Sequence, residues 1–267
     1  MTKSEYNTII LEKKEGVFRI ILNRPDKMNA LNTEMYSELN SALDELESTP
    51  TASVLIFTGA GSAFCAGGDI GELSQAAASM KAIQNRLRMS HGFALRLRNI
   101  KVPTIMAVNG SAVGAGFSLA LNGDLIVASE SARFGATFIR IGLVPDMGSI
   151  FNLVRTIGIR KAFEMAYLAD IIDARQAERI GLVNRVVASQ ELDEVVNEWA
   201  QRLTHSSAVA LSHLKQALYQ AQELTFKAEL EEEINLQSLC LLSDDGKEGL
   251  KAFMEKRKPS FGGSAGQ

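Results

Sequence analysis

A repeated order of elements constrains the fold of this 267-residue chain more than any other feature of its sequence. The segments 53–59, 103–110 and 124–129 are short runs rich in β-branched and aliphatic residues, and each is typical of a buried strand. Gly-rich loops follow the first two, and helical patterns follow the loops, the longest over about residues 79–99. Buried strands that alternate with helices predict an α/β fold with a parallel sheet.

The last part of the chain has a different pattern. From about residue 190 the strand patterns stop, and several helical segments follow. No linker rich in Ser, Gly or Pro separates these helices from the preceding part. The sequence therefore predicts an α/β core over residues 1–195 and a helical region over residues 196–267, whose helices we expect to pack on the core or on a neighbouring subunit.

Composition narrows the classes of function. A net charge of −3 gives no reason to expect nucleic acid or an anionic membrane as a partner. No apolar run approaches the roughly 20 residues of a membrane span, and the first residues lack an apolar signal segment. Cys65 and Cys240 are too few and too far apart for a disulfide framework or a zinc site. We expect a cytoplasmic protein without a metal centre.

Two Gly-rich loops, residues 59–73 and 109–121, are candidate binding elements. Small residues let a ligand approach the backbone closely, and N–H groups at a helix start favour a negatively charged oxygen. Two such loops could direct two N–H groups at one oxyanion, although the same glycines could serve only tight turns and close packing. Neither loop completes the dinucleotide-binding, phosphate-loop or hydrolase G-x-S-x-G motif.

Asp146 stands alone after an apolar run and a proline in the segment IGLVPDMGS (141–149). An aspartate there can cap the helix that follows, which is worth about 1 kcal/mol. It can also act as a catalytic base, and one carboxylate can do both. The three histidines, His91, His205 and His213, have no evident partner and are interpreted as surface or core residues.

Six segments, in order, resemble signatures of the enoyl-CoA hydratase/isomerase (crotonase) superfamily. They are LNRPDKMNAL (22–31), FCAGGDI (64–70), AVNGSAVGAGFSLAL (107–121), ARFGATFIRIGLVPDMGS (132–149), AERIGLVNRVV (177–187) and EGLKAFMEKRKPSF (248–261). The resemblance implies a crotonase-like spiral of ββα units and a C-terminal helical region that assembles trimers or dimers of trimers. It also implies an acyl-CoA substrate, with coenzyme A entering as part of the thioester and no separate cofactor.

The resemblance also assigns site residues. It carries the two oxyanion donors over to the backbone N–H groups of Gly68 and Ala115. It places the CoA portion along the loop 27–30, and Phe253 and Lys256 match positions that in relatives often reach the CoA of an adjacent subunit. The residues expected to contact substrate are Lys27, Met28, Ala30, Ala66, Asp69, Ile70, Gly114, Ser118, Phe138, Phe253 and Lys256.

Two positions depart from the hydratase pattern. Hydratases of the superfamily carry catalytic glutamates where this chain has Ser118 and Phe138. Adding water across a double bond suits two carboxylates, whereas moving a proton between two carbons on one face needs a single base. Asp146 matches the position at which dienoyl-CoA isomerases and the ring-epoxide isomerases of phenylacetate breakdown carry an aspartate, and IGLVPD is most similar to the latter.

The neighbours of Asp146 in the sequence suit a base. We expect apolar side chains to enclose it and to raise the pKa of its carboxyl above the ordinary value of about 3.9. These side chains are Phe138, Ile141, Leu143, Val144 and Met147.

The favoured interpretation is therefore an acyl-CoA isomerase with Asp146 as its base. A dehalogenase is disfavoured, because that branch pairs its aspartate with a tryptophan at the position of Phe138. Two alternatives stay open: a hydratase or other lyase that uses Asp146 with a water held by Ser118, and a non-catalytic subunit that binds acyl-CoA. The sequence does not specify the acyl group.

Overall fold

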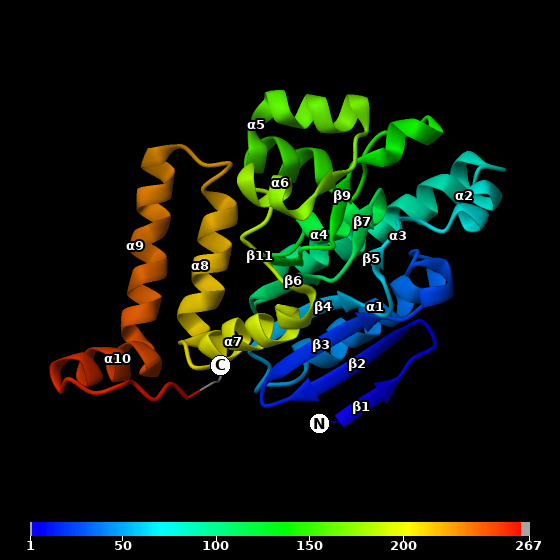
Figure 1. The fold of residues 1–267 in the computed structure, drawn as a ribbon. Coiled ribbons are helices and arrows are strands. Elements are labelled where there is room, and N and C mark those ends of the chain that lie inside the picture. Colours follow the sequence, from blue (N-terminus) through cyan, green and yellow to red (C-terminus); the bar gives the residue numbers. More distant parts are fainter. Residues whose placement is uncertain (1, 263–267) are drawn as a thin grey trace.

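The strands of this chain form two sheets, described by the computed structural model within residues 2–262 (Figure 1). The seven described strands of the larger sheet are β1 (Thr2–Glu5), β2 (Ile9–Lys14), β3 (Val17–Leu22), β4 (Val54–Gly59), β6 (Thr104–Val108), β8 (Leu125–Ser129) and β11 (Arg185–Val187). They lie in the order β1-β2-β3-β4-β6-β8-β11. The first three pair antiparallel and the later neighbours pair parallel, which confirms the predicted α/β fold.

A smaller sheet of four short strands completes the sheet structure of the described part of the chain. Its strands are β5 (Ala63–Cys65), β7 (Ser111–Val113), β9 (Arg133–Gly135) and β10 (Ile172–Asp173), in the order β10-β9-β7-β5. β5, β7 and β9 each follow a strand of the larger sheet, and a helical segment comes next in each case. This recurring unit is the ββα spiral that the resemblance implied.

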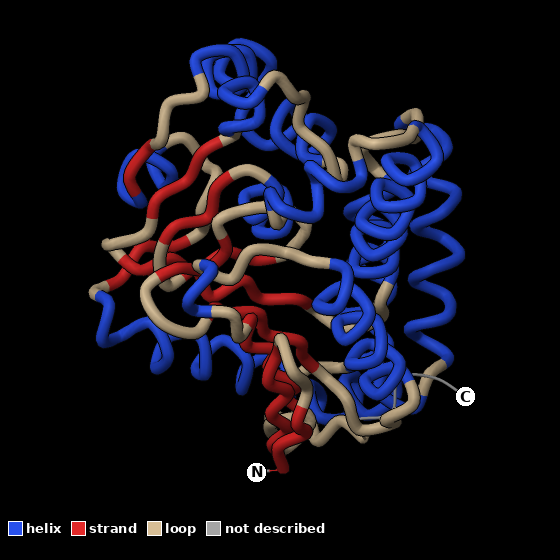
Figure 2. The backbone as a smooth tube through the Cα atoms, turned by 90° about the vertical axis from the view of Figure 1, so that its right-hand side faces the viewer, coloured by secondary structure: helices blue, strands red, loops and turns tan. Residues whose placement is uncertain are grey.

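Helices surround the strands (Figure 2). Those before residue 192 are α1 (Thr33–Glu47), α2 (Ile70–Ala76), α3 (Met80–Asn99), α4 (Ala115–Leu121), α5 (Ser149–Leu168) and α6 (Ala174–Arg179), with short 3-10 helices η1 (Pro25–Lys27), η2 (Thr137–Ile141) and η3 (Ser189–Glu191). The helix predicted over about residues 79–99 is thus confirmed as α3. Asn32 caps α1, because its side chain accepts a hydrogen bond from the Met35 N–H.

Helices cover both faces of the larger sheet. Successive side chains of β4 point to opposite faces. Phe57 belongs to the core cluster that includes Leu39 of α1, whereas Ile56 belongs to a second cluster with Val196 of α7 (Leu192–Thr204). Burial on both faces accounts for the continuous apolar composition of this strand.

The remaining helices extend away from the sheets. They are α8 (Ala208–Gln220), α9 (Phe226–Leu242) and α10 (Asp244–Met254), and α9 lies along the outer side of α8 (Figure 1). α9 buries no residue within this chain, and its Phe226 is 80% exposed. No helix within residues 2–262 has the length and apolarity to cross a membrane. The predicted division between residues 195 and 196 falls inside α7 and stays a prediction.

Glycine permits very close backbone contacts where the chain crosses between the sheets. A Cβ atom on Gly110 would lie 2.0 Å from the carbonyl oxygen of Ser62, and one on Gly116 would lie 2.1 Å from that of Cys65. Neither approach is possible for a residue with a Cβ atom, so the backbone would have to move. These two glycines hold the Gly-rich loops together.

A matched pair of glycine substitutions tests this packing. Gly116→Ala should lower the free energy of unfolding by about 1–3 kcal/mol or more, because overpacking forces backbone shifts. Gly92→Ala, in α3, meets no atom within 4 Å and should leave stability unchanged or raise it by up to about 1 kcal/mol through helix propensity. Urea unfolding of both variants measures the difference, and equal stabilities would contradict the packing argument.

Candidate active site

The two Gly-rich loops meet at the residues assigned as oxyanion donors. Gly67 has φ +110°, and a Cβ atom there would lie 3.4 Å from the Ala115 nitrogen and 3.8 Å from the Gly114 Cα. Gly114 itself has φ +55° and precedes the first residue of α4. The structure thus brings Gly67, Gly68, Gly114 and Ala115 together, although they come from loops about 47 residues apart in the chain.

Both assigned donors are free. Ala115 is the first residue of α4, where a backbone N–H has no partner within the helix. Within residues 2–262, neither the Gly68 N–H nor the Ala115 N–H donates a hydrogen bond to a protein atom. Two neighbouring unpaired N–H groups, one of them at a helix start, suit a negatively charged oxygen.

A left-handed turn fixes the backbone next to Asp146. Met147 and Gly148 have φ values of 53° and 76°, and the first is unusual for a residue with a side chain. The Met147 side chain is buried and its Sδ accepts a hydrogen bond from the Tyr36 hydroxyl at 3.2 Å. The Asn122 side-chain amide donates to the Met147 carbonyl oxygen at 2.9 Å. These contacts hold the turn and set the direction of the preceding side chain.

Asp146 does not cap the following helix. The N-cap of α5 is Gly148, and no side chain caps it. Instead, the backbone carbonyl of Asp146 accepts bonds from the Ser149 N–H at 3.0 Å and the Ser149 hydroxyl at 2.8 Å. The Asp146 Oδ1 atom is buried and has no hydrogen-bond partner among the described residues. The capping role that the sequence left open is therefore wrong, and an unsatisfied buried carboxylate oxygen remains, which is rare in folded proteins.

The environment of Asp146 favours the protonated form of its carboxyl. Burial raises the pKa of Asp146, and the nearby charges of His91 and Arg86 oppose that rise without cancelling it. The predicted direction of the pKa shift is confirmed. A carboxylate that is less stabilised as an anion is a stronger base, which suits proton removal from carbon.

The expected enclosure of Asp146 is only partly correct. Phe138 and Met147 are buried, but Ile141, Leu143 and Val144 are 44–75% exposed, because η2 and the left-handed Gly142 turn that segment outward. Asp146 lines a cavity of about 510 Å³. Its lining residues are His91, Pro145, Asp146, Met147, Gly148, Ile150, Phe151, Val154 and Arg155.

His91 is exposed on α3, in agreement with its interpretation as a surface or core residue. It also lines the same cavity as Asp146, a placement that the sequence did not predict. The core side of α3 is marked by Ser90, Phe93 and Leu97, so helical periodicity places His91 beside that buried stripe. The proximity of His91 to Asp146 depends on the packing of α3 near α5, which the sequence of α3 alone does not indicate.

The two positions that replace the hydratase glutamates are buried. Ser118 is fully buried in α4, and its hydroxyl donates to the Gly114 carbonyl oxygen at 3.4 Å, back along its own helix. Phe138 lies in η2 and is 7% exposed. Neither position supplies a carboxylate, so Asp146 is the one carboxylate among the residues that line its cavity in the described chain.

The loop assigned to the CoA portion is rigidly held. Met28 and Asn29 both adopt left-handed backbone conformations, and the buried Asn29 side chain donates to the carbonyl oxygens of Ala60 and Ala63. The Ala66 N–H donates to the Met28 carbonyl oxygen at 2.9 Å, which ties this loop to the first Gly-rich loop. Met28 is 54% exposed. The loop 27–30 therefore presents exposed side chains on a fixed backbone.

Asp69 organises the first Gly-rich loop. Its Oδ1 atom accepts from the Gly71 N–H at the start of α2, and its Oδ2 atom pairs with the Arg24 guanidinium at 3.0 Å. Partial burial favours the protonated acid, but the hydrogen bond and charge of Arg24 outweigh it and lower the pKa of Asp69. Arg24 also donates to the Ala30 carbonyl oxygen. The neighbouring Ile70 is 61% exposed.

Phe253 and Lys256 lie away from the other assigned residues of the same chain. Phe253 is 84% exposed on α10, and Lys256 follows that helix in a left-handed conformation. α10 lies on the opposite side of the molecule from α2 (Figure 1). One chain therefore does not bring these two residues to Gly68 and Asp146.

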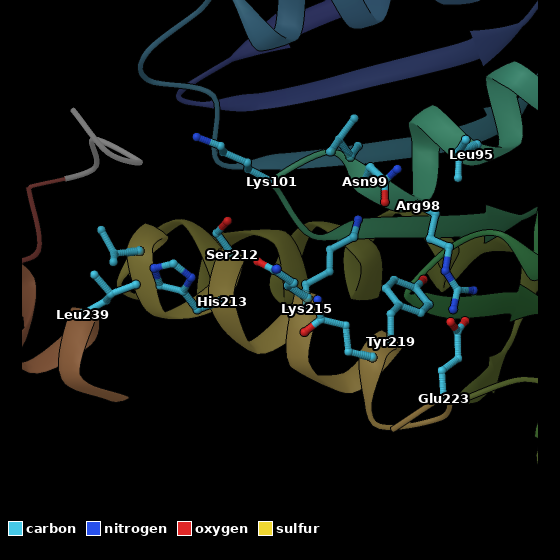
Figure 3. Close-up of a pocket in the computed structure, with 14 residues that line it drawn as sticks. Leu95, Arg98, Asn99, Lys101, Ser212, His213, Lys215, Tyr219, Glu223 and Leu239 are labelled. Carbon is cyan, nitrogen blue, oxygen red and sulfur yellow. The ribbon is translucent and has the colours of Figure 1, made fainter. Parts of the chain in front are cut away.

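A larger cavity of about 750 Å³ lies between the end of α3, α8 and α9 (Figure 3). There the Lys215 ammonium pairs with Asp124 at 2.9 Å, and the Tyr219 hydroxyl donates to the same carboxylate at 2.7 Å. The Arg98 guanidinium lies 3.9 Å from the centre of the Tyr219 ring. These groups satisfy one another, so the cluster joins α8 to the core and is not a second reactive centre.

Other reactive groups do not compete with Asp146. Cys65 is fully buried, and burial raises the pKa of its thiol to about 12, so it is not a nucleophile at neutral pH. Within residues 2–262, no cluster of three or more His, Cys, Asp or Glu side chains could hold a metal ion.

The raised pKa of Asp146 has a measurable effect on stability. A group whose pKa is higher in the folded protein contributes stability that is fully present below its unfolded pKa, about 3.9, and is lost as the pH rises through the folded value. Asp146→Asn cannot ionise and escapes this loss. The variant should therefore be more stable than the wild type near about pH 7.5, and the difference should shrink toward about pH 4.

Denaturant unfolding at both pH values measures this difference. Asp170→Asn removes an exposed carboxylate and serves as the matched control, which should leave stability unchanged. A stability of Asp146→Asn below that of the wild type at neutral pH would show that the carboxylate has a structural partner.

Comparisons with known proteins place the chain as a whole among its relatives. A family model for enoyl-CoA hydratase/isomerase matches residues 12–264. The chain is 35% identical to 1,2-epoxyphenylacetyl-CoA isomerase of Escherichia coli K12, over 96% of this chain and 98% of that protein. It is 36% identical to 2,3-dehydroadipyl-CoA hydratase of the same organism, with the same coverage.

Solved structures extend the agreement to the whole fold. The crystal structure of enoyl-CoA hydratase from Bacillus anthracis superimposes with a TM-score of 0.91 at 30% identity, covering 97% of this chain and all of that one. A family match over nearly the full length, relatives at about 35% identity and a shared fold lead to one conclusion. The chain belongs to the enoyl-CoA hydratase/isomerase family.

Proposed function

We propose that this protein is an acyl-CoA isomerase that uses one aspartate as its base. The observation that carries the proposal is the half-buried Asp146 carboxylate, whose Oδ1 atom is buried without a hydrogen-bond partner and whose pKa is raised by burial, in a cavity whose described lining contains no second carboxylate. Relatives with isomerase names and relatives with hydratase names are about equally similar to this chain, so their names do not select the reaction.

In the proposed step the thioester oxygen accepts hydrogen bonds from the N–H groups of Gly68 and Ala115. Asp146 takes a proton from the α-carbon, the C–H bond breaks, and its electron pair forms an enolate held by the two N–H groups. Asp146 then returns the proton to another carbon and is again a carboxylate. One oxyanion donor is typically worth about 3 kcal/mol, so the pair is essential for a weakly acidic thioester.

The substrate is proposed to supply its own CoA, and no separate cofactor takes part. The CoA portion would follow the loop 27–30 and the backbone near Ala66, whose contacts hold that surface in place. The acyl group would enter the cavity at Asp146. Action in the cytoplasm, without nucleic acid or membranes as partners, stays a prediction from composition.

Substitution of the base tests the reaction. Asp146→Asn should reduce turnover of an unsaturated acyl-CoA by at least about 10²-fold, the low end for a positioned general base. Mass spectrometry and NMR of the wild-type product should show a rearranged thioester of unchanged mass, and in deuterated water part of the proton should return internally. A product heavier by one water would support the hydratase alternative, and normal turnover by folded Asp146→Asn would eliminate Asp146 as the base.

We also propose that the protein assembles as a trimer or a dimer of trimers. Exposed apolar side chains on the outer helices support this, including Ile234 and Leu242 of α9, which would be costly in water. Assembly would also let Phe253 and Lys256 reach the site of a neighbour.

Light scattering measures the assembly directly. The wild type should have the mass of three or six chains at micromolar concentration. Ile234→Asp should shift the protein toward the monomer, whereas Glu231→Gln on the same helix should not. A wild-type monomer would refute the proposal.

A further inference from the structure

His91 and Asp146 lie in the same cavity on different elements. His91 is on α3, whose core side packs against α1, and Asp146 is in the turn before α5. Within residues 2–262, the exposed His91 side chain makes no hydrogen bond to the protein, and the buried Asp146 Oδ1 atom has no hydrogen-bond partner. A potential cation and an unpaired carboxylate oxygen thus lie together at the one place where the proposed reaction occurs.

The other charged or titratable groups near this carboxylate are engaged elsewhere. Arg86 of α3 pairs with Glu72 and donates to the Leu31 carbonyl oxygen at 3.2 Å. Tyr36 of α1 donates its hydroxyl to Met147 Sδ, and burial, followed by the charge of Asp146, raises its pKa far enough to keep it neutral.

Two further arginines lie on the elements beside His91. The Arg155 guanidinium of α5 lies 3.5 Å from the centre of the Phe151 ring. Arg88, three residues before His91 on α3, is exposed as His91 is, but it does not line the cavity. His91 is therefore the cation whose position is best suited to act on Asp146.

We infer that His91 is a positioning residue, whose imidazolium keeps the Asp146 carboxylate anionic and directed into the cavity. This inference rests on the proposed function of Asp146 as the base. Imidazoles change charge within the pH range of enzyme assays, and a neighbouring cation extends the range in which a buried carboxylate can accept a proton. His91 would thus set the lowest pH at which the enzyme works.

The pH dependence of kcat/KM tests the inference. Loss of the cation in His91→Gln should move the acid limb of the profile upward by about one pH unit, the low end for an opposite charge beside a carboxylate. At pH values above the acid limbs of both proteins, the activity of His91→Gln should stay within a few-fold of that of the wild type. His91→Lys restores a cation and should leave the limb at or below its wild-type position. His213→Gln, which removes a histidine from the other cavity, should leave the profile unchanged.

A readout that does not depend on activity separates this inference from the proposed function. Infrared difference spectra between the wild type and Asp146→Asn isolate the carboxyl band of Asp146, and its pH midpoint should rise by the same amount in His91→Gln. An unchanged midpoint, or a His91→Lys variant that behaves like His91→Gln, would overturn the inference. A loss of activity in His91→Gln at every pH without a shifted limb would also overturn it, because His91 would then carry the proton itself.

Discussion

The close backbone contact between the two Gly-rich loops is the constraint on which the site depends. At Gly110 and Gly116 the chain passes so near the carbonyl oxygens of Ser62 and Cys65 that no side chain fits. This contact joins two ββα units and places the free N–H groups of Gly68 and Ala115 on neighbouring loops. The proposed oxyanion site therefore depends on how the units pack, and not on either loop alone.

A second constraint acts on the base. The left-handed turn at Met147 and Gly148 is held by Asn122 from α4 and Tyr36 from α1, two elements that also belong to the core. Holding the turn this way leaves the Oδ1 atom of the Asp146 carboxylate buried and without a hydrogen-bond partner. The fold thus tolerates a local loss of stability at the proposed base, a common compromise in active sites.

Much of this arrangement could be predicted from the sequence, because it depends on local patterns. The buried strands at 53–59 and 103–110 and the helix after residue 79 follow from residue type and spacing, whereas the assignment of Gly68 and Ala115 as donors comes from the family resemblance. The three-residue strands β5, β7 and β9 could not be predicted, since each exists only by pairing with the others. The same holds for Asn122 and His91, whose roles come from contacts between elements far apart in the chain.

The central claim is that Asp146 removes a proton from the α-carbon of a thioester held by two backbone N–H groups. Exchange of the α-hydrogens of a saturated acyl-CoA in deuterated water tests it most directly, because no double bond is present to move and no water can be added. NMR should show enzyme-dependent exchange in the wild type, reduced by at least about 10²-fold in Asp146→Asn. Exchange at the wild-type rate in the folded variant would contradict the account.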